Sequence, residues 1–270
     1  MKHTMYKPLT ALMLMLIVSG KEAQSQNSVT LKTKFRDQET VQYYLRVNAN
    51  NPEYVATIQA RIIEQTRRLL PNGAATIHSE LKDIKAQLGE FDLDLHRYKT
   101  AFRSWDWVCT ARGRVRDTTV ELGFPEMQGN QPEVLKLKRR LQVSYRPQMN
   151  AALQLFRPLL PDKPIQVGDT YQAEFGGQTK AQDPAPVMQI MVVGIETKEG
   201  RTLCRLKMTA DVPSDKGKAR YEAVGFVDSR TGRYSSLTGT LTGGQFGKTS
   251  VYLSLTELPD ITKVPSKRTL

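Results

Sequence analysis

The stretch Pro158-Leu-Leu-Pro-Asp-Lys-Pro-Ile-Gln-Val-Gly-Asp-Thr-Tyr171 divides the chain into two halves. It carries three prolines, of which Pro158 and Pro161 end a helical pattern, because proline cannot continue a helix. Gly168-Asp169 is a turn signal, and an alternation of apolar and polar residues restarts behind it. The stretch therefore predicts the end of a helix followed by the first strand of a second series.

Alternation of apolar and polar residues on both sides of this stretch predicts antiparallel strands. Asn72-Gly73 and Gly113 are hairpin turn signals in the first half. Gln245–Leu258 predicts one further strand near the end of the chain. The strands expected in the first half are 29–35, 41–47, 54–66, 75–84, 91–96, 105–112 and 115–122.

One amphipathic helix is expected before the dividing stretch, over Pro147–Arg157. Proline is favourable in the first turn, and Met149, Leu153 and Phe156 follow at helical spacing. Such an apolar stripe needs a sheet to pack on. Val134–Tyr145 fits strand parity and helical spacing alike, with a slight preference for strand.

The second half repeats features of the first in the same order. A series of matched positions with preserved parity is typical of a duplicated strand series. The matches are Phe35–Leu45 with Ile165–Phe175, Asn72-Gly73 with Glu199-Gly200, and Arg112–Val115 with Thr231–Tyr234.

The fold class predicted is mainly β (α+β), with two related antiparallel strand series joined by one amphipathic helix. We expect a curved sheet or half-barrel with the helix packed on it. The predicted organisation is a signal peptide (1–25), a first β series (26–146), the connecting helix (147–161), a second β series (162–258) and a flexible tail (259–270).

The N-terminus predicts export. Lys2 and Lys7 precede Leu9–Gly20, an apolar run shorter than the ~20 residues that span a bilayer. Ala23-Gln24-Ser25 has small residues at the positions read by signal peptidase, so cleavage is expected after Ser25. The alternative is an uncleaved anchor. After cleavage, an extracytoplasmic protein (periplasmic or secreted) that does not span the membrane is expected.

The chain of 270 residues is basic, with 39 Lys and Arg against 27 Asp and Glu and a net charge of +12. Such a charge favours anionic surroundings such as lipid head groups, acidic polysaccharide or nucleic acid, and the simpler interpretation, which we prefer, is a solvated surface. Two cysteines, Cys109 and Cys204, lie on the apolar parity of their strands. They are either buried free thiols or, in an oxidising compartment, one disulfide.

No catalytic motif supports an enzyme. The chain has no Gly-x-Ser-x-Gly elbow, no His-Glu-x-x-His and no phosphate-binding loop. No catalytic residue and no cofactor are therefore predicted. No signature of a nucleic-acid-binding fold is present, so nucleic acid is not expected as a partner.

Two groups of residues are candidates for binding. Asp92, Asp94 and His96 share one face of an expected strand and could meet a metal ion, or could be a solvated face. Trp105 and Trp107 could form a ligand platform, or could be core. With the helix stripe, the candidate ligand-binding residues are Met149, Leu153, Phe156, Trp105 and Trp107.

The dividing stretch resembles an element of an uncharacterised family of exported bacterial β-rich proteins. In that element, Leu-Pro-x-Lys-Pro precedes a Val-Gly-Asp-x-Tyr/Trp segment. The matching residues are Pro161, Lys163, Pro164, Val167, Gly168, Asp169 and Tyr171, with Ile165 in place of valine. The resemblance implies export and a bacterial source, and it carries no catalytic residue.

A curved antiparallel sheet with a helix on its concave face is also similar, at the level of fold, to the periplasmic lipoprotein carriers. The function expected is an exported, non-enzymatic binding protein for an apolar or amphiphilic ligand such as a lipid. The alternative is a structural or adhesion module of the bacterial cell envelope that binds acidic polymer or a membrane surface.

Overall fold

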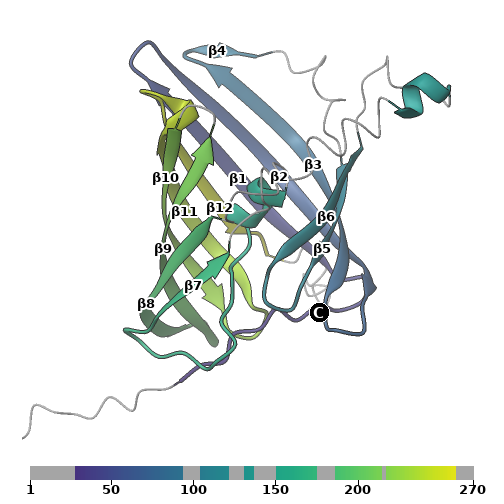
Figure 1. Ribbon diagram of the computed structural model, residues 1–270, viewed down its shortest axis with the longest axis vertical. Coiled ribbons are helices and arrows are strands. Elements are labelled where there is room, and N and C mark those ends of the chain that lie inside the picture. The colour runs from purple at the N-terminus through teal and green to yellow at the C-terminus, as the bar shows by residue number, and fades with distance from the viewer. Residues whose placement is uncertain are drawn as a thin grey trace, which may run out of the picture.

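The computed structural model describes residues 28–93, 104–121, 131–136, 150–174, 186–214 and 217–259. Within these ranges the chain is mainly β, with one twelve-stranded antiparallel sheet and short helices at 132–136 and 150–155. The sheet is long, curved and open at its upper end in Figure 1.

The first series comprises β1 (Thr40–Asn51), β2 (Tyr54–Leu69), β3 (Ala75–Leu88), β4 (Phe91–Asp92), β5 (Ser104–Cys109) and β6 (Val115–Glu121). The second comprises β7 (Thr170–Glu174), β8 (Val187–Lys198), β9 (Arg201–Ser214), β10 (Gly217–Asp228), β11 (Arg233–Gly243) and β12 (Ser250–Glu257), with the 3-10 helix η3 (Gly244–Phe246) between β11 and β12.

The strand order is β6-β5-β3-β2-β1-β12-β11-β10-β9-β8-β7, with β4 paired to β3. β1 pairs with β12, so the first and last strands of the described chain are neighbours at the centre of the sheet. The outer strands of this order are β6 and β7. Both series advance across the sheet in the same direction, as duplicated series would, and the duplication itself stays a prediction.

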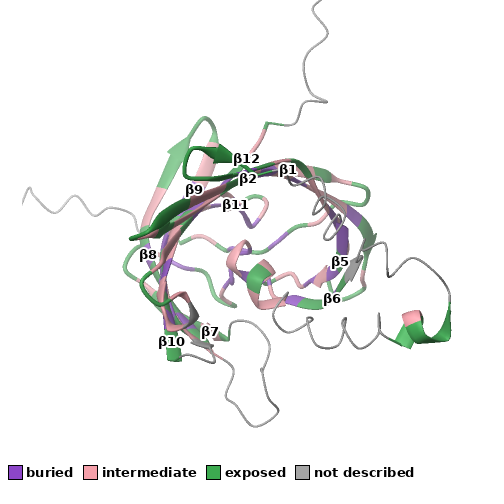
Figure 2. Ribbon diagram, turned by 90° about the horizontal axis from the view of Figure 1, so that it is seen from above, coloured by how far each residue is buried: buried purple, intermediate pink, exposed green. Residues whose placement is uncertain are grey.

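The sheet curls around the 150–155 helix, as Figure 2 shows from above. Interruptions of register in several strand pairs favour this curvature, because a β-bulge bends its strand and increases the local twist. They lie between Gln59 and Arg61, between Asp106 and Val108, and between Val192 and Gly194. The two outer strands are linked by a side-chain contact, since Arg114, just before β6, pairs with Glu174 of β7 at 2.7 Å.

The lower end of the sheet is closed by backbone contacts. Val29 forms an isolated antiparallel bridge with Ile165. The amide of Thr33 donates to Ala111 O at 2.8 Å, and the amide of Lys34 donates to Thr231 O at 3.0 Å. The expectation of a strand over 29–35 is wrong, because this segment crosses the strand ends and has no strand beside it to pair with along its length.

Three other expectations can be compared with the structure over the residues that it describes. The helix predicted over Pro147–Arg157 is present at 150–155, and residues 147–149 lie outside the described ranges. The preference for strand over Val134–Tyr145 is wrong at its start, because residues 132–136 are helical. β4 is shorter than the strand expected over 91–96, and Asp94–His96 lie outside the described residues, as do 1–27 and 260–270.

Both cysteines are buried and free, which is the unpaired alternative. Among the described residues, no helix has the length and apolar character needed to cross a membrane.

Candidate ligand-binding concavity

The inner face of the sheet is identified by Arg157, which follows the 150–155 helix and is almost wholly buried. Its guanidinium lies 4.8 Å from the ring centroid of Trp107 and 5.6 Å from that of Tyr43. The same group forms an ion pair with Glu64. Tyr43 on β1, Glu64 on β2 and Trp107 on β5 therefore face the interior.

Gln154 anchors the helix to the edge of the sheet. Its Nε2 donates to Gly113 O at 2.9 Å, and its Oε1 accepts from the amide of Val115 at 3.0 Å. The amide of Thr118 donates to Asn150 Oδ1 at 3.2 Å. The buried side-chain amide of Gln154 bonds to backbone groups beside β6, so the helix is held at one height inside the sheet. This height is the floor of the concavity.

Above the floor, the inner positions of β1, β2 and β12 are apolar. In the ladder, Leu45 lies opposite Ala60 and Val47 lies opposite Ile58. Side chains two positions apart on a strand share a face, so the register carries this face from Tyr43 to the strand ends. We refer to this set of residues as the upper inner face: Leu45, Val47, Ala49, Ala56, Ile58, Leu88 and Val251.

Exposure increases along this face. Tyr43 is 2% exposed, whereas Ile58 is 46% exposed although both point to the same side of the sheet. On the opposite wall, inner residues such as Ile190 and Met208 are fully buried. The interior is therefore filled at its floor and along β8 to β11. On β1 to β3, among the described residues, Ile58 and Leu88 are about half exposed, whereas Leu45 and Val47 are partly buried against the core.

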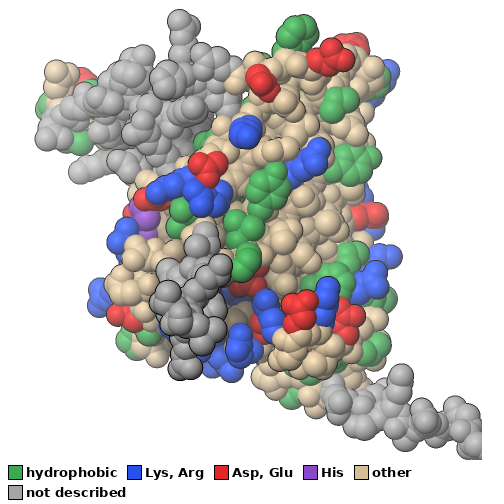
Figure 3. All heavy atoms as spheres, turned by 180° about the vertical axis from the view of Figure 1, so that it is seen from behind, with side chains coloured by type: hydrophobic (Ala, Val, Ile, Leu, Met, Phe, Trp, Pro, Cys, Tyr) green, Lys and Arg blue, Asp and Glu red, His purple; other side chains and the backbone are tan. Residues whose placement is uncertain are grey.

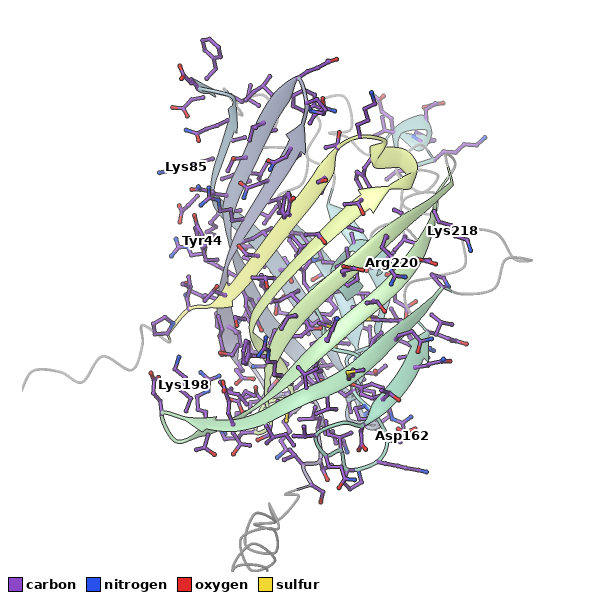
Figure 4. The ribbon with its side chains drawn as sticks, turned by 90° about the vertical axis from the view of Figure 1, so that its left-hand side faces the viewer. Tyr44, Lys85, Asp162, Lys198, Lys218 and Arg220 are labelled. Atoms are coloured by element: carbon purple, nitrogen blue, oxygen red, sulfur yellow. The ribbon has the colours of Figure 1, made fainter. Side chains whose placement is uncertain are left out.

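A second depression lies at the lower end, where the β5–β6 turn meets the dividing stretch. It has a volume of about 830 Å³. Two ion pairs cross it: Arg112 with Asp162, and Arg114 with Glu174 at 2.7 Å. Figure 4 shows Asp162 at this end of the molecule. The first pair joins the β5–β6 turn to the dividing stretch, and the second joins the residue before β6 to β7, so this depression is part of the closure.

Tyr171 also belongs to the closure. Its hydroxyl donates to Leu159 O at 2.9 Å, and burial raises the pKa of the Tyr171 phenol above its ordinary value. At neutral pH the phenol stays protonated, and its hydrogen bond to Leu159 O links β7 to the dividing stretch. The dividing stretch is also bonded to β8, because the amide of Gly168 donates to Val192 O at 2.9 Å. Its expected turn is present: Gly168 has a φ of 94°, and the amide of Gln166 donates to Asp169 Oδ2 at 2.9 Å.

The predicted ligand-binding residues lie at the floor, so far as they are described. Trp105 and Trp107 are 6% and 1% exposed, and Trp107 Nε1 donates to Ser79 Oγ at 2.8 Å. Leu153 and Phe156 are partly buried against the core, and Met149 lies outside the described residues. A role of these residues in binding stays a prediction.

Arg157 and Glu64 were not expected from the sequence. Glu64 shares the inward-facing positions of β2 with Ile62 and Thr66. A charged residue among inward-facing positions was the signal in the sequence that could have identified it. No local pattern shows that its partner is Arg157, because the two residues meet only through the fold.

The expected metal site is described only at Asp92. Asp92 is exposed, and its Oδ1 accepts from Gln87 Nε2 at 2.8 Å. Asp94 and His96 lie outside the described residues, so the metal hypothesis stays a prediction. Elsewhere in the described ranges, no three His, Cys, Asp or Glu side chains are grouped as metal ligands.

Neither Cys109 nor Cys204 has the surroundings of a reactive, nucleophilic thiol. Burial raises the pKa of Cys109 to about 12, and burial together with the nearby Asp228 raises the pKa of Cys204 to about 11. A reactive cysteine needs a lowered pKa and access to solvent. Both thiols are therefore core residues at neutral pH.

Comparison with known proteins identifies no family. No family model matches the chain, and no curated protein matches it. A solved structure of lipovitellin, described by its lipid–protein interactions, is 11% identical over 84% of this chain, with a TM-score of 0.49. The chain spans only 26% of the lipovitellin chain.

Two bacterial structures are similar over greater shares of their own length. The hypothetical lipoprotein YmcC from Escherichia coli is 14% identical, over 96% of this chain and 98% of its own, with a TM-score of 0.30. A DUF1329 family protein from Desulfovibrio piger is 8% identical, over 83% and 87%, with a TM-score of 0.27. Likenesses this loose define neither a family nor a function.

Proposed function

We propose that this protein is a non-enzymatic binding protein that holds an apolar or amphiphilic ligand, such as a lipid, against the upper inner face. The observation that carries the proposal is the row of inward-facing apolar side chains that grows more exposed from Tyr43 to Ile58. Exposed apolar surface inside a concavity costs free energy in water, at roughly 25 cal/mol per Å². A ligand with acyl chains would remove this cost.

The charges of the inner face agree with such a ligand. Arg157 and Glu64 neutralise one another at the floor. Above them, the inner positions of β1 and β2 up to Ala49 and Ala56 carry no charged side chain. A ligand chain would therefore meet only apolar groups, and a polar head group would have to stay at the open end, where water can solvate it.

We place this activity outside the cytoplasm. Lys2 and Lys7, the apolar run Leu9–Gly20 and the small residues before Gln26 support export with cleavage after Ser25. The absence of a catalytic motif supports a carrier or storage role over an enzyme.

A fluorescent acyl-chain probe titrated into the purified protein tests the proposal. Ile58→Glu places a charge on the upper inner face, so binding should weaken at least about tenfold. Gln59→Glu adds the same charge one residue away on the outer face and should leave binding within about twofold. Absence of probe binding by the unaltered protein, with no lipid extracted from it and detected by mass spectrometry, would contradict the proposal.

The second candidate is an envelope module that binds acidic polymer. It is favoured by the basic side chains at the lower end, where the ends of strands and the crossing segment meet. These are Lys32, Lys34, Arg36, Arg67, Arg68, Lys163, Lys198 and Arg230. Figure 4 shows Lys198 at this end. Binding to acidic polysaccharide that disappears with added salt would support this function, whereas salt-independent binding would exclude it.

A further inference from the structure

An apolar tip lies at the open end of the concavity, formed by the β1–β2 and β3–β4 turns. Phe91 is the most exposed large hydrophobic residue among the described ones, at 78%. Four other residues that flank these two turns are also exposed, so the group is a patch and not an isolated side chain. The apolar tip consists of Tyr54, Val55, Leu88, Phe91 and Leu93.

The two turns form one unit. The amide of Gly89 donates to Val55 O at 2.7 Å, which joins the end of β3 to the start of β2. The amide of Leu93 donates to Ala86 O at 2.8 Å and holds the chain beyond β4 against β3. Because the backbone of both turns is paired, their side chains are presented outward by an ordered scaffold.

The tip projects and is continuous with the ligand wall. Figure 1 shows the β1–β2 turn and β4 at the upper extremity of the sheet, beyond the ends of β10 and β11. Leu88 lies opposite Ala56, which is two positions from Ile58 on the inner face of β2. Apolar surface thus runs from the tip into the concavity without a charged side chain on the inner positions between.

The charged residues within the two turns are acidic. Glu53 and Glu90 lie in the turns and Asp92 in β4, while Lys248 is next to Thr249, whose Oγ1 accepts from Asn51 Nδ2 at the β1–β2 turn. Figure 3 shows hydrophobic, acidic and basic side chains at the upper end, so the tip carries no excess of basic charge. Acidic groups do not attract anionic head groups. The tip is therefore suited to the apolar layer of a neutral surface, and the basic lower end is not the part that meets it.

We propose that the apolar tip inserts into the interfacial layer of a zwitterionic lipid bilayer, where it passes an amphiphile between the bilayer and the upper inner face. This rests on the proposed function, because the tip gives the ligand its apolar route. A projecting apolar tip fits a bilayer, which deforms around it, and Tyr and Phe side chains are favourable at the interface.

Brominated acyl chains test insertion, because bromine quenches a tryptophan only within the bilayer. The chain has two tryptophans, Trp105 and Trp107, which are buried and supply a constant background. Phe91→Trp should be quenched by vesicles of brominated phosphatidylcholine. Met191→Trp is the control, because Met191 is exposed on β8, far along the sheet from β3. Its emission should stay unchanged.

Partitioning gives a second measurement. Phe91→Ser should weaken binding to phosphatidylcholine vesicles about tenfold, the expectation for removing one large apolar side chain from an interface. Added salt should not change the binding of the unaltered protein. Equal emission of the two tryptophan variants on brominated vesicles would overturn the proposal. The proposal would also be overturned if the unaltered protein self-associated, Phe91→Ser abolished this self-association, and the Phe91→Trp emission was not quenched by brominated vesicles.

Ligand binding in vesicle-free solution separates this proposal from the function on which it rests. Phe91→Ser should bind the acyl-chain probe as well as the unaltered protein does, while Ile58→Glu should bind it poorly and still insert its tip. If Phe91→Ser lost the probe in solution, the tip would be part of the ligand site and not a bilayer contact.

Discussion

Arg157 lies over the indole ring of Trp107, 4.8 Å from the ring centroid, in the interior of the sheet. The helix that ends at the dividing stretch thus places a cation on an aromatic floor, where it also meets Glu64. A cation over a tryptophan face is favourable, and the ion pair removes the cost of an unpaired buried charge. This arrangement sets the depth of the concavity.

Arg157→Met should lower the free energy of unfolding by about 3 kcal/mol, because it leaves Glu64 unpaired in the interior. Adding Glu64→Gln should restore part of the loss, since the double variant has no unpaired charge. Arg220→Met is the surface control: Arg220 pairs with Asp211 at 3.0 Å with both side chains about half exposed, and less than about 1 kcal/mol is expected. Urea denaturation measures all four proteins. A loss in Arg157→Met no greater than in Arg220→Met would contradict this role.

Gly113→Ala should loosen the closure. Gly113 has a φ of 78°, and a Cβ there would overlap the carbonyl oxygen of Pro158. Strain and overlap together are expected to cost more than about 2 kcal/mol. Gly89→Ala is the matched control, because Gly89 has a φ of 60° but no neighbour near the added Cβ. It should cost about 1 kcal/mol. Thermal unfolding distinguishes the two, and equal shifts would show that the contact with Pro158 is unimportant.

Alkaline pH should destabilise the protein through its thiols. The pKa is raised from 9.0 to about 12 for Cys109 and to about 11 for Cys204. Below pH 9 the thiols are protonated in both states, so their contribution is fully present. As pH rises above 9, the unfolded thiols ionise and the folded ones do not. The free energy of unfolding should therefore fall with increasing pH, by up to about 1.4 kcal/mol per pH unit for each thiol.

Urea denaturation at pH 8 and pH 10.5 measures this decrease. It should be smaller in Cys109→Ala/Cys204→Ala, in which the buried tyrosines still titrate. In the folded protein at pH 8, neither thiol should react with iodoacetamide, and both should react after unfolding in urea. Rapid labelling of the folded protein would show that the thiols are accessible.

Phe156→Ala should weaken binding of the acyl-chain probe about tenfold, if the floor contacts the end of the ligand chain. Phe226→Ala removes the same side chain from β10, where Arg205 lies 5.8 Å from the ring centroid, and should not affect binding. Isothermal titration measures the affinity of both variants for the probe. A loss of affinity in Phe156→Ala alone indicates a lost ligand contact, whereas a loss in both indicates a general loss of stability. Equal affinities would remove Phe156 from the site.

Much of the local structure could be predicted from the sequence. The alternation over Val41–Val47 and Tyr54–Thr66 is found within β1 and β2, and Asn72-Gly73 is found in the turn before β3. The parity of Trp105, Trp107 and Cys109 placed all three inside. These features depend on residues close in the chain, because side-chain period and turn conformation are local properties. Export is predicted on the same local grounds.

The site could be predicted only in part. Leu153 and Phe156 were expected to face the sheet, and they do pack against the core. The open wall around Ile58 was not expected, because the sequence shows that Ile58 is apolar but not that the opposite wall is filled while this one is left uncovered. The segment 29–35 has a strand pattern and still forms only one bridge, since a strand also needs a neighbour to pair with.

The sequence by itself determined the class of the fold, the parity that faces inward and the turn at Gly168-Asp169. Only the tertiary structure decided that β1 lies beside β12, that Arg157 meets Glu64, and that the turns carrying Val55 and Phe91 join into one tip. The physical reason is the range of the interactions. Strand order and buried ion pairs depend on residues far apart in the chain, and a period of two specifies which face a side chain takes but not which strand it meets.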